Sequence, residues 1–402
     1  MGTRNRKGEM PVSHHLSLRS IGAAFGLAAA LTAAVASASA HDNTADYLYV
    51  VNRDSADIAV IDTTNDTVVA QVPVGNVPHQ AIMAESLGQL IVSNTQDNTI
   101  SIIDLKTRTV SATIALDSEP EHMMLSPDGR TVAVGNIGAD SVSFVSLTEA
   151  RETARVSGLF EPHNLTYSPD GALLYVANLG ANHVSVVDVS EARVVNEIPV
   201  AAPAEVASAS ASRAIRHQGI ISVTATPDGR LGFAAHGDGN MLSVIDLQTQ
   251  AKIKDLTLSQ MPWRAYASAD GRTMIVPNNG DRTVSLIDVA TQEVAATVPG
   301  GAEMTGVNTS PLSPIAFVIS RGEDKAVLVD LTTRQTVGEI ALPGIPETGV
   351  TSPDGDKIYV ALSGSGQVAV IDVRQRKLVK TIGGVGKGAW GVSMAGAAGY
   401  CH

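Results

Sequence analysis

The sequence predicts an all-β protein, a β-propeller of four-stranded antiparallel blades. Three observations predict it: a repeat of fixed length, four short strand patterns in each repeat, and strands that are apolar on both faces. The strand runs are aliphatic and β-branched, and Gly, Asn, Asp and Pro separate them, as tight turns require.

The repeat is marked by an aspartate that ends runs of the type Ile-Ala-Val-Ile-Asp. Successive markers are separated by 42 residues, except for one interval of 58 residues. In one copy Ser146 takes the place of the aspartate. The marker aspartates are Asp62, Asp104, Asp188, Asp246, Asp288, Asp330 and Asp372. Eight copies predict eight blades, or seven if one copy is degenerate.

One copy, residues 162–200, shows the four strands and their turns. A first strand precedes the turn Ser168-Pro-Asp-Gly171, and a second strand ends at Asn178. A third strand ends at Asp188, and a fourth runs to Val200. A lone sheet of this kind would expose one apolar face of its middle strands. Stacking the copies face to face in a ring buries both faces, which is the propeller arrangement.

The two ends of the chain predict how the ring closes. The first repeat lacks its first strand and begins with residues 47–52, which match the second strand of the other copies. The chain ends with residues 389–394, which match a first strand. The C-terminal strand is therefore expected to pair with the N-terminal strand and complete the first blade, which leaves no unpaired edge at the junction.

Two runs resemble the signature of the YVTN-type β-propeller repeat family: Tyr175-Val-Ala-Asn178 and Tyr47-Leu-Tyr-Val-Val-Asn52. The resemblance covers about residues 45–396 and implies the propeller fold. It implies no single activity, because such propellers bind, scaffold or catalyse. With eight blades and an export signal, the chain is also distantly similar to haem d1-type eight-bladed propellers, but no extended match carries a ligand residue over.

Residues 1–40 have the pattern of a signal peptide: a basic start, an apolar stretch and Ala-Ser-Ala40 at the end. We expect residues 41–402 to form a single propeller domain with an inserted loop near 201–219. The expected location is periplasmic or secreted, with no membrane span after signal removal.

Charge and cysteine content restrict the partners. Removing residues 1–40 leaves 24 basic and 39 acidic residues, a net charge of −15. This acidity argues against nucleic acid, which needs stripes of Lys and Arg. A periplasmic protein or a small ligand is the expected partner. The single cysteine, Cys401, can form no internal disulfide.

Histidines supply the main functional signal. Eight remain after signal removal, and the strand order predicts that six lie at the end of the propeller where the inner strands begin, here called the top face. Imidazole is a common ligand of zinc, copper, iron and nickel. The predicted metal ligands are His79, His122, His163, His217 and His236. His183, the sixth histidine of this face, is expected at its outer rim.

Several alternatives stay open for this face. Met123, Met124 and Met304 nearby would favour copper, a haem-type cofactor is the other candidate, and Glu121 and Glu347 could act as ligands or bases. In another alternative, His122, which is one residue out of register with His79 and His163, points into a blade and not into the channel. A wet channel mouth could also solvate these side chains with no ligand at all.

The sequence therefore predicts an exported binding or scaffold propeller with a ligand or partner site at the top of its central channel. The alternatives are a propeller that binds copper or a haem-type redox cofactor, and a lactonase-like hydrolase. No serine-hydrolase, phosphate-loop or zinc-protease motif is present, so a catalytic activity is not expected.

Overall fold

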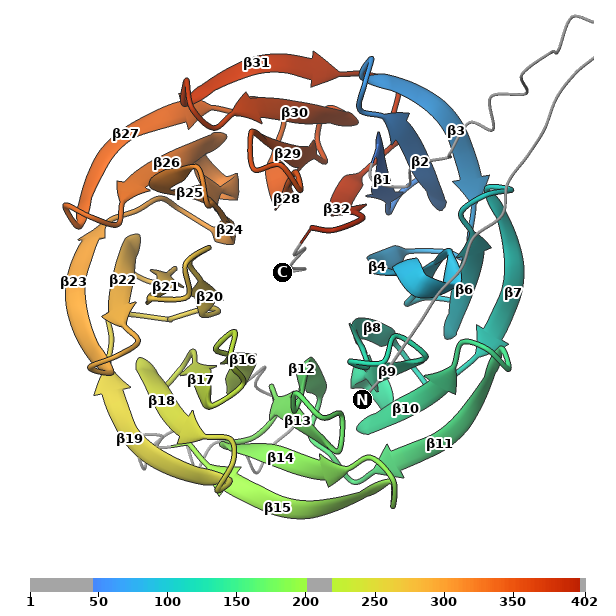
Figure 1. Ribbon diagram of the computed structural model, residues 1–402, viewed down its shortest axis with the longest axis horizontal. Coiled ribbons are helices and arrows are strands. Elements are labelled where there is room, and N and C mark those ends of the chain that lie inside the picture. The colour runs from blue at the N-terminus through green and yellow to red at the C-terminus, as the bar shows by residue number, and fades with distance from the viewer. Residues whose placement is uncertain (1–45, 201–218, 398–402) are drawn as a thin grey trace, which may run out of the picture. The chain divides into compact units, whose positions relative to one another are not determined.

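The computed structural model describes residues 46–200 and 219–397. The predicted signal peptide, most of the predicted insert, His217 and Cys401 lie outside the described residues. The described residues all belong to one unit, Asp42–His402. In it, eight four-stranded antiparallel sheets stand around a ring (Figure 1). The eight-blade prediction is confirmed.

Each blade is an up-and-down meander whose strands we call inner, second, third and outer. The inner strands are β4 (Pro78–Ala84), β8 (Pro120–Leu125), β12 (Pro162–Tyr167), β16 (Ile220–Ala225), β20 (Tyr266–Ala267), β24 (Met304–Ser310), β28 (Pro346–Thr351) and β32 (Ala389–Met394). The second strands are β1 (Tyr47–Asn52), β5 (Gln89–Asn94), β9 (Thr131–Asn136), β13 (Leu173–Asn178), β17 (Leu231–His236), β21 (Thr273–Asn278), β25 (Ser313–Ser320) and β29 (Lys357–Leu362).

The other two strands of each blade lie further from the axis. The third strands are β2 (Asp57–Asp62), β6 (Thr99–Asp104), β10 (Ser141–Ser146), β14 (His183–Asp188), β18 (Met241–Asp246), β22 (Thr283–Asp288), β26 (Lys325–Asp330) and β30 (Gln367–Asp372). The outer strands are β3 (Thr67–Pro73), β7 (Thr109–Ala115), β11 (Arg151–Ser157), β15 (Arg193–Pro199), β19 (Ala251–Thr257), β23 (Glu293–Pro299), β27 (Gln335–Ala341) and β31 (Lys377–Ile382). Three short 3₁₀ turns join strands: η2 (Glu85–Leu87), η3 (Ile137–Ala139) and η4 (Arg321–Glu323).

The marker aspartates of the repeat close the hairpin between the third and outer strands. Asp104 accepts a hydrogen bond from the backbone N–H of Thr107 at 2.7 Å, and Asp246 accepts one from Thr249 at 2.8 Å. These bonds favour the carboxylate and lower the pKa of both aspartates. The marker therefore reports turn chemistry and not a functional site.

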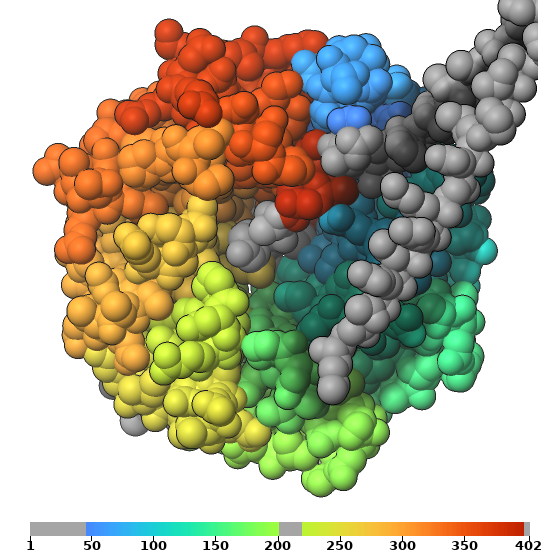
Figure 2. Space-filling view, in the orientation of Figure 1, coloured from blue at the N-terminus to red at the C-terminus, as the bar shows by residue number. Residues whose placement is uncertain are grey.

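The apolar cores lie between blades, as the two-faced strands predict. One cluster joins Leu48 and Val50 of the first blade to Tyr359 and Val370 of the last. The outer strands alternate exposed residues with partly or fully buried ones, because only one of their faces has a neighbour. Figure 2 shows the blades as adjoining sectors, with β32 in red against the blue first blade.

The ring closes as the sequence predicts. Strand β32 pairs antiparallel with β1, from Leu48 opposite Met394 to Asn52 opposite Ala389. Within the described residues, no helix is long and apolar enough to cross a membrane.

Ending the chain at Gly386 should destabilise the propeller strongly, because it removes β32 and re-exposes Leu48 and Val50. We expect the melting temperature to fall by more than about 10 °C, the effect of losing several buried apolar side chains. Thermal unfolding followed by circular dichroism measures this. A chain ending at Ala397 keeps β32 and serves as the control; equal melting of the two truncated chains would contradict the closure.

Candidate functional site

Three imidazoles predicted as ligands meet at the top face, on three successive inner strands. The ring centroids of His79 and His122 are 5.0 Å apart, and those of His122 and His163 are 4.2 Å apart. His79 and His122 are buried, with 7% and 3% of their surface exposed, and His163 is partly buried. This burial argues against simple solvated positions on a channel wall.

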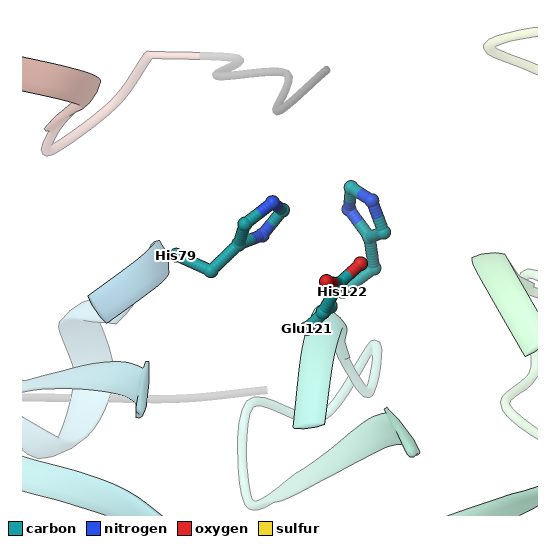
Figure 3. Close-up of side chains that lie close together, drawn as sticks. All are labelled: His79, Glu121 and His122. Carbon is teal, nitrogen blue, oxygen red and sulfur yellow. The ribbon is translucent and has the colours of Figure 1, made fainter. Parts of the chain in front are cut away.

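Glu121 joins two of these imidazoles. Its carboxylate and one ring nitrogen each of His79 and His122 all lie within 4.8 Å of one another. Figure 3 shows the rings of His79 and His122 facing each other beside the Glu121 carboxylate. This set is the strongest candidate for a metal centre among the described residues.

A β-bulge near the start of each of these strands explains why His122 reaches the cluster. In β8, Pro120 pairs with Asn136 but Met123 pairs with Val134, so Glu121 and His122 together lie opposite Gly135. A bulge resets the alternation of side chains between the two faces of a strand. The alternative in which His122 points away from His79 and His163 assumed unbroken alternation, and the contacts of its ring with both of these histidines contradict it.

The chain enters these strands through a residue with left-handed backbone conformation before the proline. Val77, Glu119 and Glu161 have φ values of 52°, 54° and 48°. Their carbonyls accept hydrogen bonds from the loop after the second strand, at 3.0–3.1 Å. Met261, Glu303 and Ile345 repeat this conformation in blades without histidine, so it belongs to the blade architecture.

Hydrogen bonds between neighbouring blades hold the bulged segments in place. Ser93 receives the backbone N–H of Gln80 and donates its hydroxyl to the carbonyl of Glu121, at 3.1 and 2.7 Å. The side-chain oxygen of Gln80 accepts the N–H of Met123 at 2.6 Å. The backbones that carry His79 and His122 are thereby fixed to each other.

Gly135 is a supporting residue that the sequence reasoning missed. A Cβ at this position would lie 2.7 Å from the carbonyl oxygen of Pro162. Glycine therefore permits the close approach of β9 to the segment that carries His163. The signal in the sequence was Val134-Gly-Asn136, where the corresponding copy has Val176-Ala-Asn178.

A chain of hydrogen bonds sets the tautomers of His163 and His122. Nδ1 of His163 lies 2.8 Å from the carbonyl oxygen of Ile221, which can only accept, so this nitrogen carries the proton. Burial, with the nearby positive charge of Arg264, lowers the pKa of His163 to about 4, although the bond to Ile221 opposes this. His163 is therefore neutral at pH 7 and its Nε2 is an acceptor.

The second link of this chain is the 3.1 Å contact between Nε2 of His163 and Nε2 of His122. Since His163 accepts there, His122 carries its proton on Nε2, and a neutral His122 presents an unprotonated Nδ1. Histidine ligands of metals are commonly oriented in this way, with the second ring nitrogen donating to a neighbouring acceptor.

Other predicted site residues lie elsewhere. His236 is fully buried: Nε2 lies 2.7 Å from Oδ1 of Asn182, and Nδ1 accepts the N–H of Gly239 at 2.8 Å. This ring links the β13–β14 turn of the preceding blade to the β17–β18 turn of its own blade. Asn178, at the same position in the preceding blade, bonds instead to residues of β14 in its own blade. His183 lies against Phe160, and Nε2 is 3.7 Å from the Glu197 carboxylate.

The methionines expected to favour copper are not at the site. Met123 packs in the core between the second and third blades, and Met304 in another interblade core. Met124 packs against a third such core. Their thioethers fill apolar space between blades. The expectation that these methionines lie near the histidines and favour copper is therefore wrong.

Glu347 is buried on β28, apart from the metal candidate. Its Oε1 lies 3.2 Å from Nε of Arg321 and accepts the hydroxyl of Ser363 at 2.5 Å. Burial raises its pKa, although Ser363 and Arg321 act in the opposite direction. Ion pairing therefore only partly offsets the cost of burying this charge.

The family comparison agrees with this architecture. A profile of the YNCE-like beta-propeller family matches residues 83–398. The chain belongs to this family. No curated protein matches the sequence.

Three solved structures show the same fold. Dihydro-heme d1 dehydrogenase NirN, in complex with DHE, has a TM-score of 0.71 and 16% identity over 88% of this chain and 76% of that chain. Hydrazine synthase of Kuenenia stuttgartiensis gives 0.54 and 21%, over 74% and 95%. A protein of unknown function from Desulfotomaculum acetoxidans DSM 771 gives 0.60 and 14%, over 87% and 98%. The predicted similarity to haem d1-type propellers is confirmed at the level of fold.

The buried carboxyl of Glu347 should make stability depend on pH. The pKa of Glu347 is higher in the folded state than in the unfolded state. Its contribution to the free energy of unfolding is therefore fully present below the unfolded-state pKa, and it is lost as the pH rises through the folded-state pKa. Glu347→Gln is neutral throughout, so its melting temperature relative to wild type should rise by about 2 °C between pH 4 and pH 7. Glu339→Gln changes an exposed carboxyl and is the control. An equal shift in both variants would contradict the assignment.

Proposed function

We propose that the propeller binds a divalent transition-metal ion at its top face, through His79, Glu121 and His122. The observation that carries the proposal is the meeting of these three donors within 4.8 Å, from two neighbouring blades. The proton on Nε2 of His122 supports it, because Nδ1 is then unprotonated and its lone pair can bind an ion. His163 acts as an orienting residue in this proposal.

The donor set favours zinc or a similar ion. Two imidazoles and a carboxylate are a known ligand set of zinc enzymes, in which a fourth position stays open for water or another ligand. Nitrogen donors argue against magnesium and calcium, which prefer oxygen. Tetrahedral zinc with bonds of about 2.0–2.1 Å separates its donors by roughly 3.3 Å. Rotation of the three side chains would bring them from their present spacing to that distance.

The predicted export signal supports a site of action outside the cytoplasm, where the ion would be captured or presented to a partner. The acidic surface supports a cationic partner. The alternative function is a scaffold that binds a partner without any ion. The zinc titration described below distinguishes this scaffold from a metal-binding propeller.

Zinc titration of the tag-free protein by isothermal calorimetry should give one bound ion per chain. His79→Ala and His122→Ala should each weaken binding by about 100-fold or more, because each removes a ligand. His163→Ala should weaken it by about 10–100-fold, the usual effect of losing an orienting partner. The rise in melting temperature on adding zinc should be reduced most in His79→Ala and His122→Ala, and less in His163→Ala.

His183→Ala is the matched control, since its ring lies against Phe160 and Glu197. No zinc binding by the wild-type protein, or an equal loss in the His183 variant, would contradict the proposal. A visible haem-type spectrum in protein purified from its own host would favour the haem-type alternative instead.

A further inference from the structure

A tryptophan and an arginine continue the row of rings on the side of His79. Trp390 lies near the start of β32, the inner strand next to β4. Its ring centroid is 6.1 Å from that of His79, with the planes at 49°. The guanidinium carbon of Arg53 lies 4.6 Å from the centroid of the Trp390 ring. These separations place Arg53 within about 11 Å of the His79 ring.

Backbone contacts fix these two side chains relative to the site. The N–H of Arg53 donates to the carbonyl of Gly388 at 2.9 Å, which ties the loop after β1 to the start of β32. The carbonyl of Trp390 accepts the hydroxyl of Thr348 at 3.2 Å. These bonds fix the backbone positions of both residues, and the contact between the guanidinium and the indole then sets their side chains beside His79.

The charges in this region favour an anion. A divalent ion bound by two neutral imidazoles and one carboxylate keeps one net positive charge and an open position. Arg53 forms no ion pair with any described carboxylate. The positive charge of Arg53 helps to lower the pKa of Glu347, but the direct partners of Oε1 of that carboxylate are Arg321 and Ser363.

We propose, on the basis of the metal site proposed above, that the bound ion and Arg53 together hold a planar organic dicarboxylate. One carboxylate occupies the open position of the ion, and the other meets the guanidinium of Arg53. The planar body lies along the indole of Trp390, which offers an apolar stacking surface between the two charges. An inorganic anion would use the ion alone and gain nothing from the indole.

The test uses the full-length protein loaded with Co²⁺, whose visible spectrum reports a change of coordination. Terephthalate is the probe with two carboxylates, and benzoate is the matched probe that lacks the second one. Both should shift the spectrum of the wild-type protein, and terephthalate should bind about 10-fold more tightly. Arg53→Gln should remove that difference with little effect on benzoate, and Trp390→Leu should weaken both acids.

Arg374→Gln is the control variant, because Arg374 pairs with Asp356 in the turns at the opposite ends of the strands. Co²⁺ affinity should be unchanged in all three variants. If Co²⁺ binds and neither acid moves the spectrum, the dicarboxylate site is overturned and the metal site stands. The same follows if Arg53→Gln leaves the preference for terephthalate intact. Failure of Co²⁺ to bind the wild-type protein overturns both.

Discussion

Burial of the second and third strands on both faces is the constraint on which the structure depends. A strand such as β5 or β6 can be covered on both sides only if a blade stands before it and another behind it. Every blade therefore needs two neighbours, and an open row would leave two apolar faces in water. Closing the ring satisfies all eight blades, and the pairing of β32 with β1 fixes the closure.

The same stacking creates the candidate site. Inner strands of neighbouring blades lie side by side at the axis, so residues 42 positions apart in the sequence become neighbours in space. His79 and Glu121 are related by one repeat, as are Glu121 and His163. A strict repeat would then place one kind of side chain around the whole mouth. This chain varies that position, which places two imidazoles and a carboxylate on one arc of the mouth.

The bulges of the inner strands decide which of these side chains can meet. Two consecutive residues, Glu121 and His122, contribute to one cluster because the bulge places both opposite a single residue of β9. That residue is Gly135, which also lets the neighbouring blade approach. The position-by-position comparison of repeats could find His79 and His163, but not the local geometry that brings His122 between them.

His163 and His236 show that residue type alone does not define what a histidine does at this face. Both were predicted ligands at the same face, and both are imidazoles in buried or partly buried positions. Their hydrogen bonds differ: both ring nitrogens of His236 bond to turn residues, Asn182 of the preceding blade and Gly239 of its own, whereas Nε2 of His163 contacts Nε2 of His122. The partners Asn182, Gly239 and Ile221 are distant or differently spaced in sequence, so no pattern could assign them.

The sequence alone determined the strand number, the eight-fold repeat, the mode of ring closure and the face on which the histidines gather. These follow from period, turn chemistry and apolar patterning, which are local properties that every copy repeats. Only the tertiary structure decided that His79, Glu121 and His122 converge, that Nε2 of His163 meets Nε2 of His122, and that the three methionines pack in interblade cores. Those outcomes depend on bulges, close approaches and hydrogen bonds between blades, and such contacts exist only once the ring has closed.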